Sequence, residues 1–197
     1  MRIIAGSAKG RVLRSLRGRA LRPTADRVRE SVFGALGERV MGARFLDLYA
    51  GAGTVGLEAL SRGAAEATFL ESHRPAGQVI EENARRCGFE GRARVIIAPV
   101  ARGLARLRRE AAVFDLVFVD PPYERGEPGG AMARLGQWPR MVAEGGVLVC
   151  QHSRHEEVGE QIGAFERMRR MRFGETVVDF YQQGGQAIDN GAVCGDV

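Results

Sequence analysis

The sequence is poor in the residues that build metal sites and disulfide networks, and it lacks the long apolar runs that span membranes. Its three cysteines, Cys87, Cys150 and Cys194, are too few and too scattered for a zinc site or a disulfide framework. His152 and His155 lie three residues apart without a third ligand nearby, so we expect no metal and place both in a solvated loop after a strand. No apolar run approaches the roughly 20 residues that a membrane helix requires.

The N-terminal stretch MRIIAGSAKG also lacks the apolar core of a signal peptide. With 45% hydrophobic and 27% charged residues, the composition is that of an ordinary globular protein. The length of 197 residues suits one compact domain with a small appendage. We therefore expect a cytoplasmic protein without membrane contact or an obligate protein partner, and a monomer.

Lysine is almost absent, and Lys9 is its single representative, so arginine carries the positive charge. Residues 1–39 contain ten Lys and Arg against three Asp and Glu, whereas the remaining residues contain 19 against 21. This concentration of positive charge at one end is expected of a surface that contacts phosphate. The basic residues of the N-terminal region are Lys9, Arg11, Arg14, Arg17, Arg19 and Arg22.

The first 40 residues predict a hairpin followed by a helix. Residues 2–5 and 11–16 have the character of two short strands around a turn, a basic hairpin within residues 1–22. Thr24 is a suitable N-cap for an amphipathic helix over residues 25–38. The apolar stripe of this helix consists of Val28, Val32, Phe33 and Leu36.

Beyond this helix, apolar strands alternate with helices, which indicates an α/β fold whose parallel sheet is covered on both faces. Strands are predicted at 44–49, 66–71, 93–98, 114–120 and 146–151, and helices near 54–62, 74–86, 100–110 and 130–143. A short helix at 155–163 and an antiparallel strand pair, 165–173 and 175–183, should complete the sheet edge. The sequence thus predicts one Rossmann-like domain over 23–183, with a mostly parallel seven-stranded sheet and an antiparallel edge hairpin, and a loose tail at 184–197.

A glycine turn follows the first strand of this sheet. Gly51-x-Gly53-x-x-Gly56 allows positive φ and close approach of a nucleotide-like ligand. Glu71 lies 20 residues after Gly51, at the end of the next strand, where a carboxylate can accept hydrogen bonds from ribose hydroxyls. These features also fit NAD. Asp47, however, directly precedes the turn and would repel a pyrophosphate, whereas it would attract the ammonium group of S-adenosylmethionine, directly or through water.

A second motif, Asp120-Pro121-Pro122-Tyr123, ends the fourth strand at the same edge of the sheet. In open α/β sheets ligands bind at this edge. Asp120 offers an acceptor-only carboxylate, the Pro121 carbonyl can point at a ligand, and Tyr123 can stack on a base. The motif resembles the [DN]PP[YFW] motif of S-adenosylmethionine-dependent amino-group methyltransferases, which identifies the glycine turn as a methyl-donor site.

The residue types match the demands of this chemistry. An exocyclic amine of a nucleobase is a poor nucleophile, because its lone pair is delocalised into the ring. Hydrogen bonds from the amine to Asp120 and to the Pro121 carbonyl favour the pyramidal nitrogen that attacks the methyl group, and alignment supplies most of the acceleration. The reaction requires neither a metal nor a strong general base. A carbon-5 pyrimidine methyltransferase would instead require a nucleophilic cysteine near this motif, and none directly follows the proline pair.

Nearly the whole chain, from Arg2 to about Gln183, is similar to the bacterial 16S ribosomal RNA guanine-N2 methyltransferases of the RsmD type. The stretches that carry the resemblance are RIIAGSAKGRVL, LRPTADRVRESVFGAL, FLDLYAGAGTVGLEALSRGA and VFVDPPY. It implies a Rossmann-like S-adenosylmethionine-dependent methyltransferase fold with a small N-terminal hairpin. It also implies methylation of one guanine in the head of the small subunit, on the 30S particle or an assembly intermediate.

The resemblance assigns three sets of residues. The S-adenosylmethionine site consists of Asp47, Tyr49, Ala50, Gly51, Gly53, Glu71, Ser72, Pro99, Val100 and Asp120, with Pro99 and Val100 standing where the family generally has a polar residue near the adenine. The catalytic residues are Asp120, Pro121, Pro122 and Tyr123. The RNA-binding residues are Lys9, Arg11, Arg22, Thr24, Arg27 and Arg29, and Glu30 is a further candidate contact.

Three alternatives remain open from the sequence. The first is an amino methyltransferase of another target, such as adenine-N6 in DNA, another RNA or a protein glutamine, although Asp rather than Asn at position 120 disfavours glutamine. The second is an NAD-dependent oxidoreductase, which would bind the dinucleotide and not S-adenosylmethionine. The third is a non-catalytic RNA-binding module with a relic donor pocket.

Overall fold

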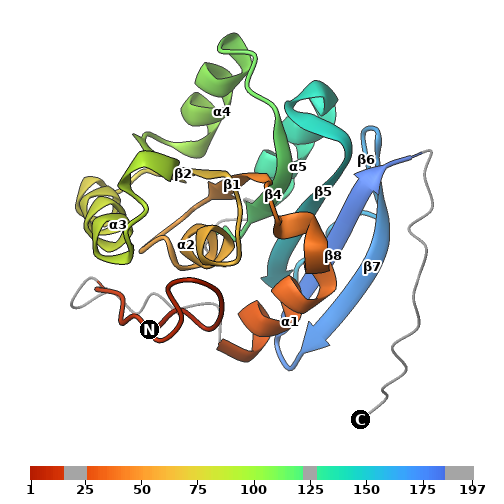
Figure 1. Cartoon of the computed structure of the whole chain (residues 1–197). Coiled ribbons are helices and arrows are strands. Elements are labelled where there is room, and N and C mark those ends of the chain that lie inside the picture. The colour runs from red at the N-terminus through yellow and green to blue at the C-terminus, as the bar shows by residue number, and fades with distance from the viewer. Residues whose placement is uncertain (16–25, 122–127, 185–197) are drawn as a thin grey trace.

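A computed structural model of the chain describes residues 1–15, 26–121 and 128–184. One sheet of eight strands in the order β3-β2-β1-β4-β5-β8-β7-β6 forms its centre (Figure 1). The strands are β1 (Arg44–Leu48), β2 (Glu66–Glu71), β3 (Ala93–Ile97), β4 (Phe114–Val119), β5 (Val142–Ser153), β6 (Gln161–Ile162), β7 (Phe165–Phe173) and β8 (Thr176–Gln183). The helices are α1 (Asp26–Leu36), α2 (Thr54–Ser61), α3 (Arg74–Cys87), α4 (Val100–Arg109) and α5 (Pro128–Gln137), with 3₁₀ turns η1 (Gly37–Val40), η2 (Glu90–Arg92) and η3 (Pro139–Met141).

The predicted α/β architecture is confirmed. β3, β2, β1, β4 and β5 pair in parallel, so their carboxyl ends lie at one edge of the sheet. β8 pairs antiparallel with β5 and with β7, which is the predicted hairpin at the far side of the sheet. Two apolar clusters fill the two faces. One contains residues of α1, α2 and α3, and the other contains residues of α4 and α5.

The segment after β5 differs from the prediction. No helix forms at 155–163, because Ser153 and Glu156 close a turn: the Glu156 carboxylate accepts the Ser153 N–H, and the Glu156 N–H bonds back to the Ser153 carbonyl. Farther along, Gln161 and Ile162 pair with β7. This short β6 brings the sheet to eight strands instead of the predicted seven.

The predicted N-terminal hairpin forms around the bridge between Arg2 and Val12. The Ile3 N–H donates to the Arg11 carbonyl and the Leu13 N–H to the Met1 carbonyl, both at 3.0 Å, and the Gly10 N–H donates to the Ile3 carbonyl at 2.9 Å. The next residues bond to side chains of α2: the buried Glu58 carboxylate accepts the N–H groups of Ile4 and Ala5 at 2.8 and 3.0 Å, and Ser61 Oγ donates to the Ala5 carbonyl at 2.6 Å. Side-chain anchors on a neighbouring helix therefore take over where the backbone pairing ends.

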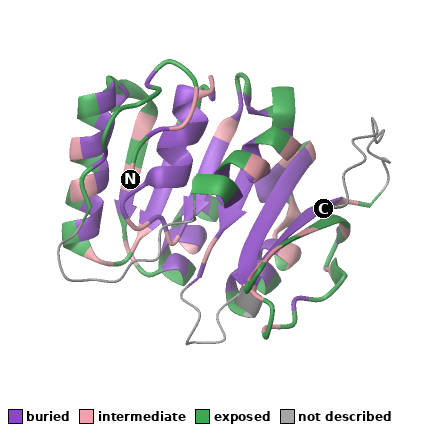
Figure 2. Cartoon of the chain, turned by 90° about the horizontal axis from the view of Figure 1, so that it is seen from below, coloured by how far each residue is buried: buried purple, intermediate pink, exposed green. Residues whose placement is uncertain are grey.

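α1 has the predicted amphipathic character, with Val28, Val32, Phe33 and Leu36 buried. Its proposed N-cap, Thr24, lies outside the described residues. Burial is concentrated in the sheet and on the inner sides of the helices, as Figure 2 shows. Within residues 1–15, 26–121 and 128–184, no helix combines the length and apolar character needed to cross a membrane.

Candidate functional site

The three carboxylates predicted for the site belong to neighbouring strands. Asp47 lies in β1, Glu71 ends β2, and Asp120 directly follows β4. Because β1 pairs in parallel with both β2 and β4, these three positions lie close to the carboxyl edge of the sheet. The topology thus brings together the glycine-turn and proline-pair regions, which are separated by about seventy residues in the sequence.

The turn after β1 has the backbone that the glycines predict. Gly51 has φ of 57° and Gly53 has φ of 78°, in the left-handed region that glycine adopts without steric cost. Tyr49 also has a positive φ, 62°, which costs free energy in a residue with a side chain. The Gly53 N–H donates to the Ala50 carbonyl at 2.7 Å and closes the turn just before α2. The buried Ala50 is in turn held by its own N–H, which donates to the Leu70 carbonyl at 3.1 Å.

Glu71 holds this turn in place. Its Oε2 accepts the Gly51 N–H at 2.8 Å, and its Oε1 accepts the His73 N–H at 2.7 Å. Each oxygen retains a lone pair for a further donor, such as a ribose hydroxyl. The side chain is half-buried, and the next residue, Ser72, is exposed. Glu71 can therefore fix the turn and bind a ligand with the same carboxylate.

Asp47 is 2% exposed, and its Oδ2 accepts the Gly56 N–H at 2.9 Å. Burial raises the pKa of Asp47 to about 7, against the lowering effect of the Gly56 N–H, and the charges of Asp120 and Glu71 raise it further. Three carboxylates thus repel one another at one edge of the sheet. A cationic group bound nearby would relieve this repulsion.

Gly56 serves packing, because a Cβ there would lie 2.3 Å from the Phe69 ring. α2 can therefore approach β2 closely, which is the role of the third glycine in nucleotide-binding turns.

The third strand contributes Pro99 and Val100. The Ala98 N–H donates to the Glu71 carbonyl at 3.0 Å, so the chain that leaves β3 runs beside Glu71. Pro99 then precedes α4, and Val100 is its buried first residue. The structure therefore places both of these predicted cofactor-site residues next to the Glu71 side of the site.

Asp120 is oriented from the neighbouring strand. Gln151, near the end of β5, donates from Nε2 to Asp120 Oδ1 at 3.0 Å. Pro121 is buried. The remaining residues of the motif, Pro122 and Tyr123, lie outside the described residues.

The residues around Asp120 do not favour thiolate chemistry. Cys150 is buried in β5, and burial, followed by the charges of Asp179 and Asp120, raises the pKa of its thiol. A nucleophilic cysteine requires the opposite shift. Among the described residues, no group of three or more His, Cys, Asp or Glu is placed to hold a metal ion.

The loop predicted for the two histidines is wrong for His152. This residue is 2% exposed within β5, and its Nε2 lies 3.1 Å from Asp179 Oδ2. His155 is exposed in the turn beyond the strand. The reason is that β5 continues to Ser153, two residues farther than its apolar run indicates.

The basic residues predicted to bind RNA divide into three groups. Lys9, Arg11 and Arg27 are exposed, as is the further candidate Glu30. A second group, Arg17, Arg19, Arg22 and Thr24, lies outside the described residues, and Arg14 is half-exposed in an ion pair with Glu82.

Arg29 forms the third group and corrects the prediction. Its side chain is 1% exposed, and Nη2 donates to the Arg2 carbonyl at 2.7 Å and to Asp26 at 3.1 Å. Its Nε lies 3.6 Å from the fully buried Glu58 carboxylate. Arg29 therefore joins α1 to the N-terminal segment instead of facing RNA.

Sequence reasoning missed three residues that organise the site. Gln151 could have been found, because it ends a predicted strand next to the one that carries Asp120. Asn83 is fully buried in α3 and bonds both Ala52 of the glycine turn and the backbone of Arg14. Its signal is a polar residue beside Ile80 and Ala84 on the apolar side of a helix. Glu58 gave only the weaker signal of an acidic residue inside the apolar stretch VGLEAL.

A family model described as "Conserved hypothetical protein 95" matches residues 1–182. The chain is 34% identical to YlbH of Bacillus subtilis over 185 residues, which cover 94% of this chain and all of YlbH. It is 41% identical to ribosomal RNA small subunit methyltransferase D of Escherichia coli over 126 residues, 64% of this chain and 62% of that protein. The solved structure of yhhF from Escherichia coli superposes with a TM-score of 0.81 at 32% identity and covers 94% of this chain and 99% of its own. A hypothetical protein from Thermus thermophilus gives a TM-score of 0.80 at 31% identity, with coverage of 92% and 99%.

Proposed function

Since the chain belongs to the family described as conserved hypothetical protein 95, we propose that it methylates the exocyclic N2 amine of one guanine in 16S ribosomal RNA. The resemblance to the RsmD-type family is confirmed, and with it the methyltransferase fold and the cofactor S-adenosylmethionine. The RNA target is supported by the name of the Escherichia coli relative, a small-subunit ribosomal RNA methyltransferase. We propose as substrate the 30S particle or an assembly intermediate.

The observation that carries the proposal is the convergence of Asp47, Glu71 and Asp120 at one edge of the sheet. S-adenosylmethionine supplies an electrophilic methyl group on a sulfonium, and this cation suits an acidic site. Glu71 would accept hydrogen bonds from the ribose, and Asp47 would attract the ammonium group. The pyrophosphate of NAD would meet the same carboxylates unfavourably, and the methyltransferase relatives count against the oxidoreductase alternative.

The amine would be held by this chain's own acceptors. Asp120 and the carbonyl of the buried Pro121 follow β4 side by side, and Gln151 fixes the Asp120 carboxylate. Two acceptors on one amine restrain its hydrogens and direct the nitrogen lone pair toward the donor. This orientation can supply several kcal/mol of the roughly 7–11 kcal/mol available from alignment, so the attack itself needs no strong general base, and the proton that the methylated nitrogen loses can pass to Asp120 or to solvent.

The test is the Asp120→Ala variant. It should still bind S-adenosylmethionine in calorimetry, because Glu71 and Asp47 remain, and should methylate 30S particles at least about a hundredfold more slowly, because the amine is no longer aligned. Asp115→Ala is the matched control, since Asp115 lies near the other end of the same strand, paired with Arg44. Unimpaired methyl transfer by Asp120→Ala would refute the role of this carboxylate.

The alternative targets are separated by product analysis. Mass spectrometry of nucleosides from treated 30S particles should show N2-methylguanosine, and treated duplex DNA should show no N6-methyladenine. The reverse result would make the protein a DNA adenine methyltransferase. Absence of methyl incorporation into any RNA would favour the non-catalytic RNA-binding module.

A further inference from the structure

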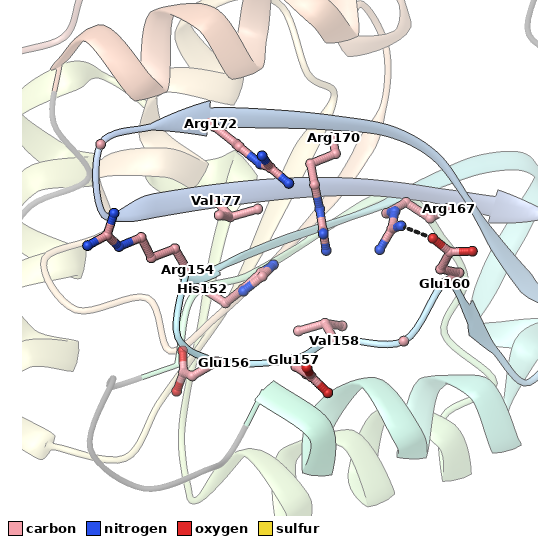
Figure 3. Close-up of a pocket in the computed structure, with 12 residues that line it drawn as sticks. His152, Arg154, Glu156, Glu157, Val158, Glu160, Arg167, Arg170, Arg172 and Val177 are labelled. Atoms are coloured by element: carbon pink, nitrogen blue, oxygen red, sulfur yellow. Dashed lines mark hydrogen bonds and ion pairs between the residues drawn. The ribbon is translucent and has the colours of Figure 1, made fainter.

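A cavity of about 850 Å³ lies beside the edge hairpin, between β7, the end of β5 and the segment 154–160 (Figure 3). It is adjacent to the acceptor edge of the sheet and not over the glycine turn. His152 lines it and directly follows Gln151 in β5, so the two side chains point to opposite faces of the sheet, Gln151 toward Asp120 and His152 toward the cavity. A polynucleotide whose target base reaches Asp120 would reach this cavity by crossing the carboxyl end of β5.

One wall of the cavity is basic. Arg167, Arg170 and Arg172 of β7 line it, and Figure 3 shows their side chains directed from the strand into the space. Asp179 of β8 lies beneath them, fully buried, and accepts both Arg170 hydrogen bonds at 2.7 Å. This buried carboxylate fixes the position of the Arg170 guanidinium and leaves its remaining N–H groups for other acceptors.

Arg172 differs from its neighbours. Arg167 pairs with Glu160, but within the described part of the chain Arg172 has no hydrogen bond or ion pair, and it is exposed. It is thus a free cation on the cavity wall.

The facing segment carries carboxylates. Glu156 caps the Ser153 N–H with one oxygen, and Glu157 is exposed. Guanidiniums on one wall and carboxylates on the other match the two ends of a nucleotide. Its phosphate accepts hydrogen bonds, and the amino groups of its base donate them.

The position of the cavity supplies the second argument. The N-terminal segment, with exposed Lys9 and Arg11, packs against α2, whereas β7 lies on the other side of β4 and β5 (Figure 1). In the order of strands Asp120 lies between these two basic surfaces, and Lys9 lies toward the C-terminal end of α2, where the Ser7 N–H bonds the Ser61 carbonyl. An RNA strand that places one base at Asp120 extends in both directions from it, and the N-terminal segment can contact only one of them.

We propose that this cavity is a subsite for an RNA nucleotide that flanks the target base, with the phosphate bound by Arg172 and Arg170. The inference rests on the proposed RNA substrate and deepens it. The subsite would add contacts to the RNA phosphate backbone. These contacts would position the RNA strand but would not distinguish one base from another.

The test is Arg172→Ala, measured by anisotropy with a 16S RNA fragment at several salt concentrations. Loss of one phosphate contact should lower the slope of log affinity against log salt by about 0.7 to 1, and should weaken binding by about tenfold. Arg169→Ala is the matched control, because Arg169 pairs with Phe180 on the opposite face of the same strand. It should leave the slope and affinity close to those of the wild type, and neither variant should change affinity for S-adenosylmethionine.

Three outcomes decide the matter. If the slope of log affinity against log salt is unchanged in Arg172→Ala, the subsite proposal is wrong. The proposed function is still supported in that case if the wild type methylates the RNA. An equal loss in both variants also overturns the subsite, since the attraction would then belong to the general charge of β7. Wild-type protein that neither binds nor methylates the RNA overturns both proposals.

Discussion

At the scale of single residues, Asp47 lowers the stability of the folded protein. Its carboxylate is buried beside two other carboxylates, and a hydrogen bond from the Gly56 N–H opposes the cost of ionising it. The free protein therefore carries an electrostatic cost at Asp47, which the proposed binding of a cationic donor would relieve.

This electrostatic cost predicts a pH dependence of stability. The pKa of Asp47 is about 7 in the folded protein against an ordinary 3.8, so between these values the folded state binds more protons than the unfolded state. The free energy of unfolding should therefore fall as pH rises from about 4 to 7, by about 4 kcal/mol at most. Asp47→Asn should remove this pH-dependent loss. The free energy of unfolding measured with urea should therefore be higher in the variant than in the wild type, and the difference should be larger at pH 8 than at pH 5.

Asp115→Asn is the opposite control for this measurement. Hydrogen bonding to Arg44 lowers the pKa of Asp115, so its contribution to stability is present at neutral pH and is lost as pH falls. Its removal should cost stability at pH 8 rather than add to it. Parallel pH profiles for wild type and Asp47→Asn would contradict the buried, ionisable state of Asp47.

At the scale of elements, the N-terminal segment is fixed to the donor site by α3. Asn83 accepts the Arg14 N–H at 2.8 Å and donates to the carbonyls of Arg14 and Ala52 at 3.0 and 3.1 Å. The position of the basic segment and the shape of the glycine turn therefore depend on the same buried amide.

Asn83→Ala should destabilise the fold by about 2 kcal/mol, because it leaves partly buried backbone groups without partners. Urea unfolding measures this loss. Arg14→Ala is the control, since it removes an exposed ion pair with Glu82 but keeps the backbone bonds to Asn83, and it should change stability little. If the two variants behaved alike, the amide would not anchor the segment.

The order of elements from α1 to β5 was predictable, because apolar periodicity reports burial and most of these elements bury one face. The pairing of the N-terminal hairpin was predictable near Arg2 and Val12, but its first strand was predicted too long, because the backbone groups of Ile4 and Ala5 bond to Glu58 and Ser61 on a helix that is distant in sequence. The helix predicted at 155–163 does not form. A local turn between Ser153 and Glu156 instead pairs the backbone groups of these two residues.

The candidate site was predictable to the extent that topology determines it. The ends of strands β1, β2 and β4 had to meet, and they placed Asp47, Glu71 and Asp120 together. Burial of a charge was not predictable. Arg29 had the sequence character of a phosphate contact, and only the fold shows that it lies beside Glu58.

At the scale of the whole molecule, positive charge lies on both sides of β4 in the order of strands. The sequence showed one side, because residues 1–39 hold the excess of basic residues. The sequence does not show the basic surface of β7, because acidic residues near its arginines in the sequence offset their charge. In the fold, alternate side chains of β7 point to opposite faces of the sheet, and this brings Arg172 to the cavity.

This arrangement predicts additive effects of variants on the two sides. Lys9 is exposed in the N-terminal segment against α2, and Arg172 lies in β7, beyond β5 in the order of strands. Lys9→Ala and Arg172→Ala should each lower the salt slope of RNA binding by about 0.7 to 1, and the double variant should lower it by the sum. Anisotropy titrations of the single and double variants with one 16S RNA fragment measure this. A double variant no weaker than either single one would mean that the two cations share a single stretch of backbone, because separate phosphates release their counterions independently.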